Sequence, residues 1–427
     1  MRSILTILLI FQGVVMGAVL DSIKIKGVEI PLIFEKSDAL PIVSMQIIFQ
    51  KSGSIEDKNL PGLAKFSAKM LNQGTKSLGN VGFANRLEQK AINFGVSCGI
   101  ETFVLEMSSL KDEYKAGINL ISLLLQEPNL TPKAFEKVKI NSLGYLSRKE
   151  DDFDYVAAIN LKKILFKDTP LEYPSYGTIE SLEKITLKDV KNFLKEHLVL
   201  KRAIVVIGGD LSLKEAKDSI KKILLKLEVG EFEPLKFYDA NSKQETKLVK
   251  KDTKQAYIYF GSPYYLKVED DDNYKARVAS FILGTGGFGS RLMEEIRVKR
   301  GLAYSAYSRV NINRSHSYFS GYLQTKLKSQ DEAIKIVKEV IKDFVEKGAT
   351  KKELDAAKKF LLGSEPLRNE TLSQRLSRAF NEYYRGKPLG FSKEELKKIE
   401  TLTLEELNSF IRSHPEIINF SFSIVTK

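Results

Sequence analysis

The chain has 427 residues, 43% of them hydrophobic, which is enough apolar material for more than one buried core and excludes a disordered or fibrous protein. One cysteine, three histidines and no tryptophan exclude a disulfide framework or a metal site built on several cysteines. The formal net charge is +13, but lysines alternate with acids along the chain, and this pattern favours a solvated surface over a nucleic-acid-binding stripe.

The first element in chain order is an apolar segment behind a short basic start. Arg2 precedes a run that is apolar from residue 4 to 20 apart from Thr6 and Gln12, and the run includes the small residues Gly17 and Ala18, where a signal peptidase could cut. This pattern predicts a secretory signal peptide over residues 1–18, and hence an exported protein, periplasmic or secreted. An uncleaved membrane anchor is the alternative, because the run is near the shortest length that spans a bilayer. No later stretch of the sequence is long and apolar enough to span.

The rest of the chain contains an internal duplication. Segment 185–194 aligns with 402–411, and each begins with a threonine, Thr186 or Thr403, that an acid follows three residues later, as in a helix-capping box. Both predicted helices lead into apolar strands, at 203–207 and 420–425. Two earlier segments, 45–49 and 131–144, align in the same order with 256–260 and 350–363.

Each half therefore consists of strands, then several amphipathic helices, then a final helix and strand. This order predicts the α+β class, with two duplicated domains that each hold a mostly antiparallel sheet packed against helices. We expect these domains at residues 19–227 and 247–427. Residues 228–246, which lack helical and strand periodicity, are the expected linker.

Two familiar catalytic patterns have no support. Residues 284–289 fit G-x-G-x-x-G, but helical spacing precedes them and the expected acid about 20 residues later is absent, so a dinucleotide site is not predicted. Cys98 has no neighbouring histidine in the sequence, and no G-x-S-x-G elbow occurs. Nucleophilic hydrolase chemistry is therefore not indicated.

The segment 62–75, GLAKFSAKMLNQGT, resembles the zinc-binding segment of the insulinase/pitrilysin metallopeptidases, the family of mitochondrial processing peptidase, whose helix carries H-x-x-E-H. Laid on that motif, the two histidines fall on Lys65 and Lys69, and the catalytic glutamate falls on Ala68. A lysine ammonium has no free lone pair, and alanine cannot take a proton from water. The third ligand of the family, a glutamate, would fall near Leu143. The resemblance therefore implies a degenerate zinc motif and no metal in this chain.

The three histidines do not suggest another metal site. His197 and His414 occupy equivalent positions of the duplication, so we expect them to be well separated in space. His316 lies near a predicted loop. We expect each to be an ordinary surface or cap residue rather than a ligand.

Residues 290–305 resemble the family's second signature, in which an arginine and a tyrosine stand seven residues apart. Here they are Arg297 and Tyr304. The resemblance implies that both bind substrate and support catalysis, since a guanidinium offers fixed donors to peptide carbonyls and a phenol O–H can stabilise an oxyanion. Without the resemblance, the same residues would be a helix-surface arginine and a buried strand tyrosine.

Family members with a damaged zinc helix and an intact arginine–tyrosine pair are partners of a zinc-bearing subunit, and the two form a clamshell. The resemblance implies that this chain is the non-zinc subunit of an exported heterodimeric zinc endopeptidase, with zinc in the partner, no cofactor of its own, and peptides as substrates. A catalytically inactive peptide- or partner-binding pseudo-enzyme is the first alternative, and an autonomous metallopeptidase is the last. The positive charge is expected to favour acidic peptides.

Overall fold

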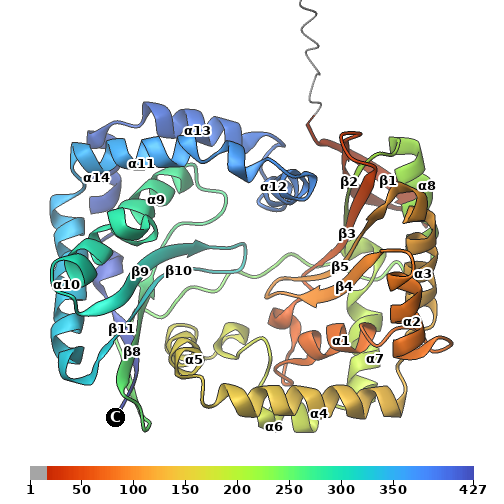
Figure 1. Cartoon of the computed structure of the whole chain (residues 1–427), viewed down its shortest axis with the longest axis horizontal. Helices are drawn as coiled ribbons and strands as arrows, with labels where there is room; N and C mark the ends of the chain where they lie inside the picture. Colours follow the sequence, from red (N-terminus) through yellow and green to blue (C-terminus); the bar gives the residue numbers. More distant parts are fainter. Residues whose placement is uncertain (1–16) are drawn as a thin grey trace, which may run out of the picture.

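The computed structural model describes residues 17–427, so all but the last two residues of the predicted signal peptide lie outside the described part of the chain. Two sheets, each with its own helices, form the two halves of the molecule (Figure 1). No helix within residues 17–427 is long and apolar enough to cross a membrane.

The first half is built on a six-stranded sheet with the order β1-β2-β6-β3-β5-β4. All neighbouring strands are antiparallel except β2 and β6, which are parallel. The strands are β1 (Val19–Ile25), β2 (Val28–Lys36), β3 (Ile42–Gln50), β4 (Asn93–Cys98), β5 (Thr102–Leu110) and β6 (Ala203–Gly209). Strand β4 therefore lies at one edge of this sheet.

The second half repeats this topology. Its five-stranded sheet has the order β7-β11-β8-β10-β9, and only β7 and β11 are parallel. The strands are β7 (Thr246–Lys250), β8 (Gln255–Pro263), β9 (Ala303–Ile312), β10 (Ser317–Lys326) and β11 (Ser421–Thr426). Without β1, the first sheet has the same order, and β9 takes the edge position of β4. The predicted α+β fold with two duplicated sheets is confirmed.

Helices cover one face of each sheet. In the first half these are α1 (Leu63–Leu71), α2 (Gly79–Glu88), α3 (Tyr114–Gln126), α4 (Pro132–Lys149), α6 (Ile179–Lys184), α7 (Leu187–His197) and α8 (Leu213–Leu224). In the second half they are α9 (Asn273–Ser280), α10 (Gln330–Lys347), α11 (Lys351–Gly363), α13 (Phe391–Thr401) and α14 (Leu404–Arg412). The predicted capping boxes of Thr186 and Thr403 are both formed.

Two further helices cross between the halves. Helix α5 (Phe153–Leu165) lies in the first half of the sequence but packs on β8 and β11 of the second sheet. Helix α12 (Leu372–Tyr384) makes the reverse crossing and packs on β2 and β6. Leu372 and Leu376 thereby join an apolar cluster on the first sheet, and each buried leucine contributes about 2 kcal/mol. The exchange ties the two halves together.

Polar contacts reinforce this junction. Glu35 of β2, almost fully buried, accepts a hydrogen bond from Arg375 Nε of α12 at 2.6 Å. The turns of the β4–β5 and β9–β10 hairpins also meet, because Ser315 donates from its backbone and its hydroxyl to Glu101. Residues 228–245, which contain no helix or strand, run along the same region, where Tyr238 N donates to Ser315 O.

Candidate functional site

Helix α1, which carries the degenerate zinc motif, exposes only two of its side chains in part. Lys65 and Lys69 are half-buried, whereas the remaining residues of the helix, Ala68 among them, are buried. Residues four apart share one face of a helix, so both ammonium groups point the same way. The Asp57 carboxylate fixes the helix start by accepting hydrogen bonds from the backbone of Gly62 at 2.6 Å and Ala64 at 2.7 Å.

The start of α1 is pressed against a loop that supplies Tyr176. Gly62 has a φ of +95°, and a Cβ there would lie 2.8 Å from the Tyr176 carbonyl oxygen, so this close approach requires glycine. Lys65 Nζ lies 4.8 Å from the centre of the Tyr176 ring. Lys69 Nζ lies 5.6 Å from the same ring and 5.5 Å from that of Tyr145 on α4.

These groups belong to a continuous set that we term the lysine–tyrosine cluster. The Tyr145 and Tyr176 rings are 4.8 Å apart, and Lys149 Nζ lies within 6 Å of the rings of Tyr145 and Tyr155. Contacts of this kind hold a cation against the negative face of an aromatic ring. The cluster consists of Lys65, Lys69, Tyr145, Lys149, Tyr155 and Tyr176.

The residues at the motif positions do not fit zinc. Lys69 Nζ donates to Ser142 Oγ at 2.9 Å, so Ser142, one residue before the expected Leu143, faces the motif from α4. Burial and the charge of Lys65 lower the pKa of Lys69, but the described residues near it offer no histidine or carboxylate to complete a ligand set. Within residues 17–427 no group of three His, Cys, Asp or Glu side chains could hold a metal ion.

The expectation that the histidines are surface or cap residues was wrong for two of them. His197 and His316 are 1% and 2% exposed. Burial, together with the nearby charge of Arg202, lowers the pKa of His197 to about 4, and burial lowers that of His316 to about 3. Stacking on Phe193 and Tyr318 respectively explains why these rings are inside: they serve as flat, neutral packing groups.

Side chains from α1 also bind the free edge of the first sheet. Asn72, which follows α1, accepts a hydrogen bond from Val96 N at 2.9 Å and donates to Val96 O at 2.8 Å. Lys65 Nζ donates to Cys98 O at 2.8 Å. An edge strand normally offers such groups to another strand. Here the chain's own side chains occupy part of the edge of β4.

In the second half, Arg297 and Tyr304 lie against each other. The Arg297 guanidinium carbon is 4.3 Å from the centre of the Tyr304 ring and 4.5 Å from that of Phe288. Tyr304 is 81% exposed, so the interpretation of a buried strand tyrosine was wrong. The guanidinium thus lies between two aromatic rings at the surface, with its orientation restricted before any ligand arrives.

The backbone beneath this pair is tightly packed. Arg297 belongs to a π-helical segment (Met293–Val298), and Tyr304 is the second residue of the edge strand β9. A Cβ on Gly284 would lie 2.3 Å from Ser308 N, so the chain after α9 contacts β9 directly. Arg291 holds the same segment through two hydrogen bonds to Glu353, at 2.6 and 2.8 Å. These contacts fix the position of the backbone that carries Arg297 and Tyr304.

The lysine–tyrosine cluster and the Arg297–Tyr304 pair lie in different halves. α1 and β9 occupy opposite sides of the molecule in Figure 1. The structure therefore brings each predicted group of site residues together internally but does not combine them into one site.

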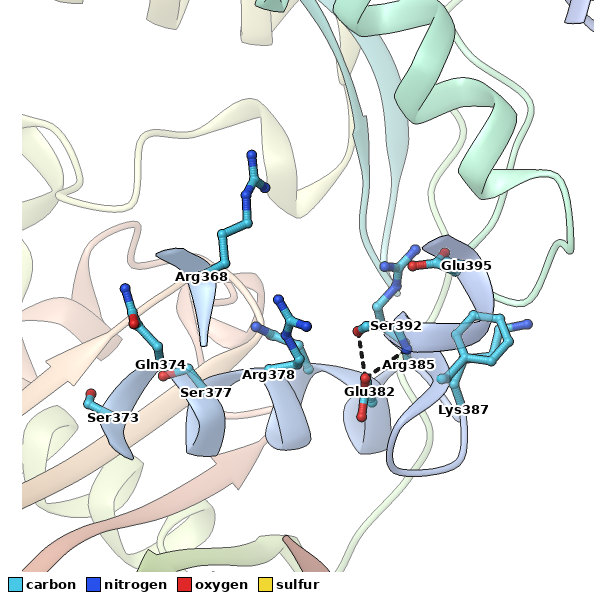
Figure 2. A pocket seen from close by; sticks show the side chains of 12 residues that line it. Arg368, Ser373, Gln374, Ser377, Arg378, Glu382, Arg385, Lys387, Ser392 and Glu395 are labelled. Atoms are coloured by element: carbon cyan, nitrogen blue, oxygen red, sulfur yellow. Dashed lines mark hydrogen bonds between the residues drawn. The ribbon is translucent and has the colours of Figure 1, made fainter. Parts of the chain in front are cut away.

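A third polar region is a pocket of about 480 Å³ between α12 and α13, shown in Figure 2. Arg368, Arg378 and Arg385 line it, together with serine side chains. Arg378 is paired with Glu365, and Glu382 is held by the backbone and hydroxyl of Ser392. This pocket has its own internal counter-charges.

Four residues that contact the predicted site residues or the edge of β4 could not be identified from the sequence. Tyr145 and Tyr176 lie far from α1 in the sequence, so no short-range spacing connects them with Lys65 and Lys69. Phe288 belongs to the glycine-rich segment that was considered only as a dinucleotide motif. The role of Asn72 depends on strand order, which no local pattern reveals.

Comparisons with known proteins identify the family of this chain. The family model of insulinase, peptidase family M16, matches residues 35–179, and that of the peptidase M16 inactive domain matches residues 184–361. A curated Helicobacter pylori protein named non-peptidase homolog YmxG is 44% identical over 426 residues, which cover 100% of this chain and 98% of that protein. The chain belongs to peptidase family M16. It is a member of the inactive type, with a degenerate zinc motif.

Two solved structures share the fold. The peptidase M16 inactive domain from Pseudomonas fluorescens superposes with a TM-score of 0.88 at 23% identity, over 95% of this chain and 97% of that one. A protease from Helicobacter pylori superposes with a TM-score of 0.84 at 16% identity, over 96% of this chain and 100% of that one. These likenesses show that the same fold extends over both halves of the chain.

Proposed function

We propose that this M16 chain is the non-zinc subunit of an exported, heterodimeric zinc endopeptidase that acts on peptides. One observation carries the proposal: Arg297 is stacked between Phe288 and the exposed Tyr304, while Lys65, Ala68 and Lys69 of the same chain do not fit a metal. A chain that has Arg297 and Tyr304 but no zinc ligands needs a second, zinc-bearing chain to hydrolyse a peptide. The partner in this proposal is a related M16 subunit that carries the zinc.

The chemistry of the pair suits a supporting role. The planar Arg297 guanidinium can donate two parallel hydrogen bonds to carbonyl groups of an extended peptide. The Tyr304 hydroxyl can donate to the oxyanion that forms when a peptide carbonyl becomes tetrahedral. Stacking lowers the entropy that Arg297 loses when it binds, because its side chain is already ordered.

The closed edge of β4 favours a second candidate, a peptide- or partner-binding pseudo-enzyme without a catalytic complement. Asn72 and Lys65 occupy backbone groups that an extended peptide would otherwise bind by strand addition. In this case the chain would bind peptides elsewhere, and chelators would not change their affinity. Tight peptide binding without recovery of a zinc-bearing partner would favour it.

The test combines the chain with a zinc-bearing M16 chain from the same organism and measures cleavage of a quenched fluorescent peptide. We expect activity only in the mixture, with kcat/KM reduced about 100-fold by Arg297→Ala and about tenfold or more by Tyr304→Phe. Tyr265→Phe is the matched control, because Tyr265 is also exposed but lies outside the pair. Activity that never appears in the mixture, or that both pair variants leave unchanged, contradicts the proposal.

Export is part of the proposal and has its own test. It rests on the basic and apolar pattern of residues 1–18. Amino-terminal sequencing of the protein purified from its native cells should begin at or close to Val19, and fractionation should place it outside the cytoplasm. A mature protein that still begins at Met1 in the cytoplasmic fraction would contradict export.

A further inference from the structure

We propose that the lysine–tyrosine cluster binds a carboxylate of a peptide, either an acidic side chain or the C-terminal group. This inference rests on the proposed peptide-binding role and adds a subsite to it. The cluster takes the place of the zinc motif but offers the opposite chemistry: cations and hydrogen-bond donors instead of metal ligands.

Lys65 and Lys69 carry two positive charges that no described carboxylate compensates. Lys65 and Lys69 stand one turn apart and half-buried on α1, and within residues 17–427 neither forms an ion pair with a carboxylate. Burial and, after it, the nearby charge of Lys65 lower the pKa of Lys69. Holding two like charges together in a partly desolvated place is unfavourable. A bound carboxylate would remove that cost, because it brings the missing opposite charge.

The ammonium groups of Lys65 and Lys69 also have N–H donors that are free to bind a ligand. An ammonium group has three N–H donors. Lys65 uses one on Cys98 O and Lys69 uses one on Ser142 Oγ, so both retain donors for a ligand. The Tyr145 and Tyr176 rings pack against the two ammonium groups and restrict their positions. The hydroxyl of Tyr155, at the far end of the cluster, is buried and has no hydrogen-bond partner among the described residues.

Several other cationic groups of the described chain form ion pairs within it. In the pocket of Figure 2, Arg378 pairs with Glu365, Lys387 lies 3.5 Å from Asp271, and Glu395 also lines the cavity. Within the lysine–tyrosine cluster itself, Lys149 pairs with Asp152 at 2.5 Å. Lys65 and Lys69 differ from these cations because they have no carboxylate partner in the described part of the chain, and they also share one face of α1 beside two aromatic rings.

The experiment measures binding of labelled peptides to the isolated full-length mature chain by fluorescence anisotropy, without any partner. One peptide set exchanges an internal Glu for Gln, and a second set exchanges the free C-terminus for an amide. We expect loss of the recognised carboxylate to weaken binding about tenfold, and the set that responds identifies the source of the carboxylate. The Lys65→Gln/Lys69→Gln double variant should bind charged and neutral peptides equally.

Controls separate this inference from the proposed function. Lys137→Gln, at an exposed position of α4, removes one positive charge outside the cluster and should keep the discrimination. The double variant should stay folded, because glutamine keeps hydrogen-bond donors toward Cys98 O and Ser142 Oγ while the two repelling charges are lost, and a thermal unfolding curve checks this. Peptide binding without discrimination, or discrimination that survives in the double variant, contradicts only the carboxylate subsite. A chain that binds none of the peptides contradicts both the subsite and the peptide-binding role.

Discussion

The neighbourhoods of the two edge strands, β4 and β9, differ although the duplication places them at equivalent positions. Beside β4, the regular helix α1 presents two lysines, and Asn72 binds the strand edge. Beside β9, π-helical turns contact the strand through Gly284 and present Arg297 against the exposed Tyr304. The same topological position thus closes an edge in one half and displays a polar pair in the other. After a duplication, a fold can keep its sheet and change the function of its edges.

The largest expected effect comes from the backbone contact beneath the Arg297–Tyr304 pair. In Gly284→Ala, the added Cβ would lie within 2.4 Å of the Ser308 backbone, so strand or helix must shift. We expect the free energy of unfolding to fall by about 3 kcal/mol in urea titrations, since main-chain atoms cannot rotate away. Gly289→Ala, where the new Cβ meets no atom within 4 Å, is the control and should change stability by less than about 0.5 kcal/mol. Equal stability of both variants would show that β9 is not held this way.

The second prediction concerns the loss of stability at acid pH that the buried histidines of the two halves, His197 and His316, cause. The folded chain keeps His197 and His316 neutral down to pKa values of about 4 and 3, whereas the unfolded chain binds protons at these rings below pH 6.5. The unfolded state therefore binds more protons, and stability falls as pH falls from 6.5 toward 4. At pH 5 each buried histidine should lower the free energy of unfolding by about 2 kcal/mol relative to its value at pH 7.

Replacing one ring tests this prediction. The loss of stability between pH 7 and 5 should be smaller by about 2 kcal/mol in His197→Gln or His316→Gln than in the wild type. Burial raises the pKa of Asp57 to about 7, which acts in the opposite direction, but this contribution is common to all three proteins and cancels in the comparison. Parallel stability curves for wild type and variants would refute the assignment.

The smallest effect concerns the closed edge of β4. Asn72→Ala removes two hydrogen bonds to Val96 at a solvent-exposed position, so we expect a loss of about 1 kcal/mol and faster hydrogen exchange at the Val96 amide. Asn85→Ala, at an exposed position of α2, is the matched control. Unchanged exchange at Val96 would mean that Asn72 does not protect the strand.

Much of the fold was accessible from the sequence because its signals are local. The capping boxes at Thr186 and Thr403 and the apolar strands after them marked the duplication, and the observed strand orders confirm it. The crossing of α5 and α12 was not predictable in this way. The amphipathic pattern of a helix shows that one face is buried, but it does not identify which of two similar sheets covers that face.

In the candidate site, likewise, short-range features could be predicted and tertiary contacts could not. The spacing of Lys65 and Lys69, and of Arg297 and Tyr304, could be compared with family signatures because each pair is short-range. The partners that give these residues their geometry, Tyr176 and Phe288 among them, come from loops whose contacts depend on tertiary packing. The burial of His197 followed from stacking on Phe193, a contact that composition alone cannot indicate.

The reciprocal exchange of α5 and α12 also bears on how the chain acquires its structure during synthesis. Strand β6 completes the first sheet at Gly209, but α12, which covers the apolar cluster of Ile33, Ile48, Ile204 and Val206, starts at Leu372. About 160 further residues must leave the ribosome first, which takes roughly 10–30 s at ordinary elongation rates. During that interval the first sheet has one bare apolar face, and α5 has no sheet to bind. The first half therefore completes the burial of this apolar face only after most of the second half has been synthesised.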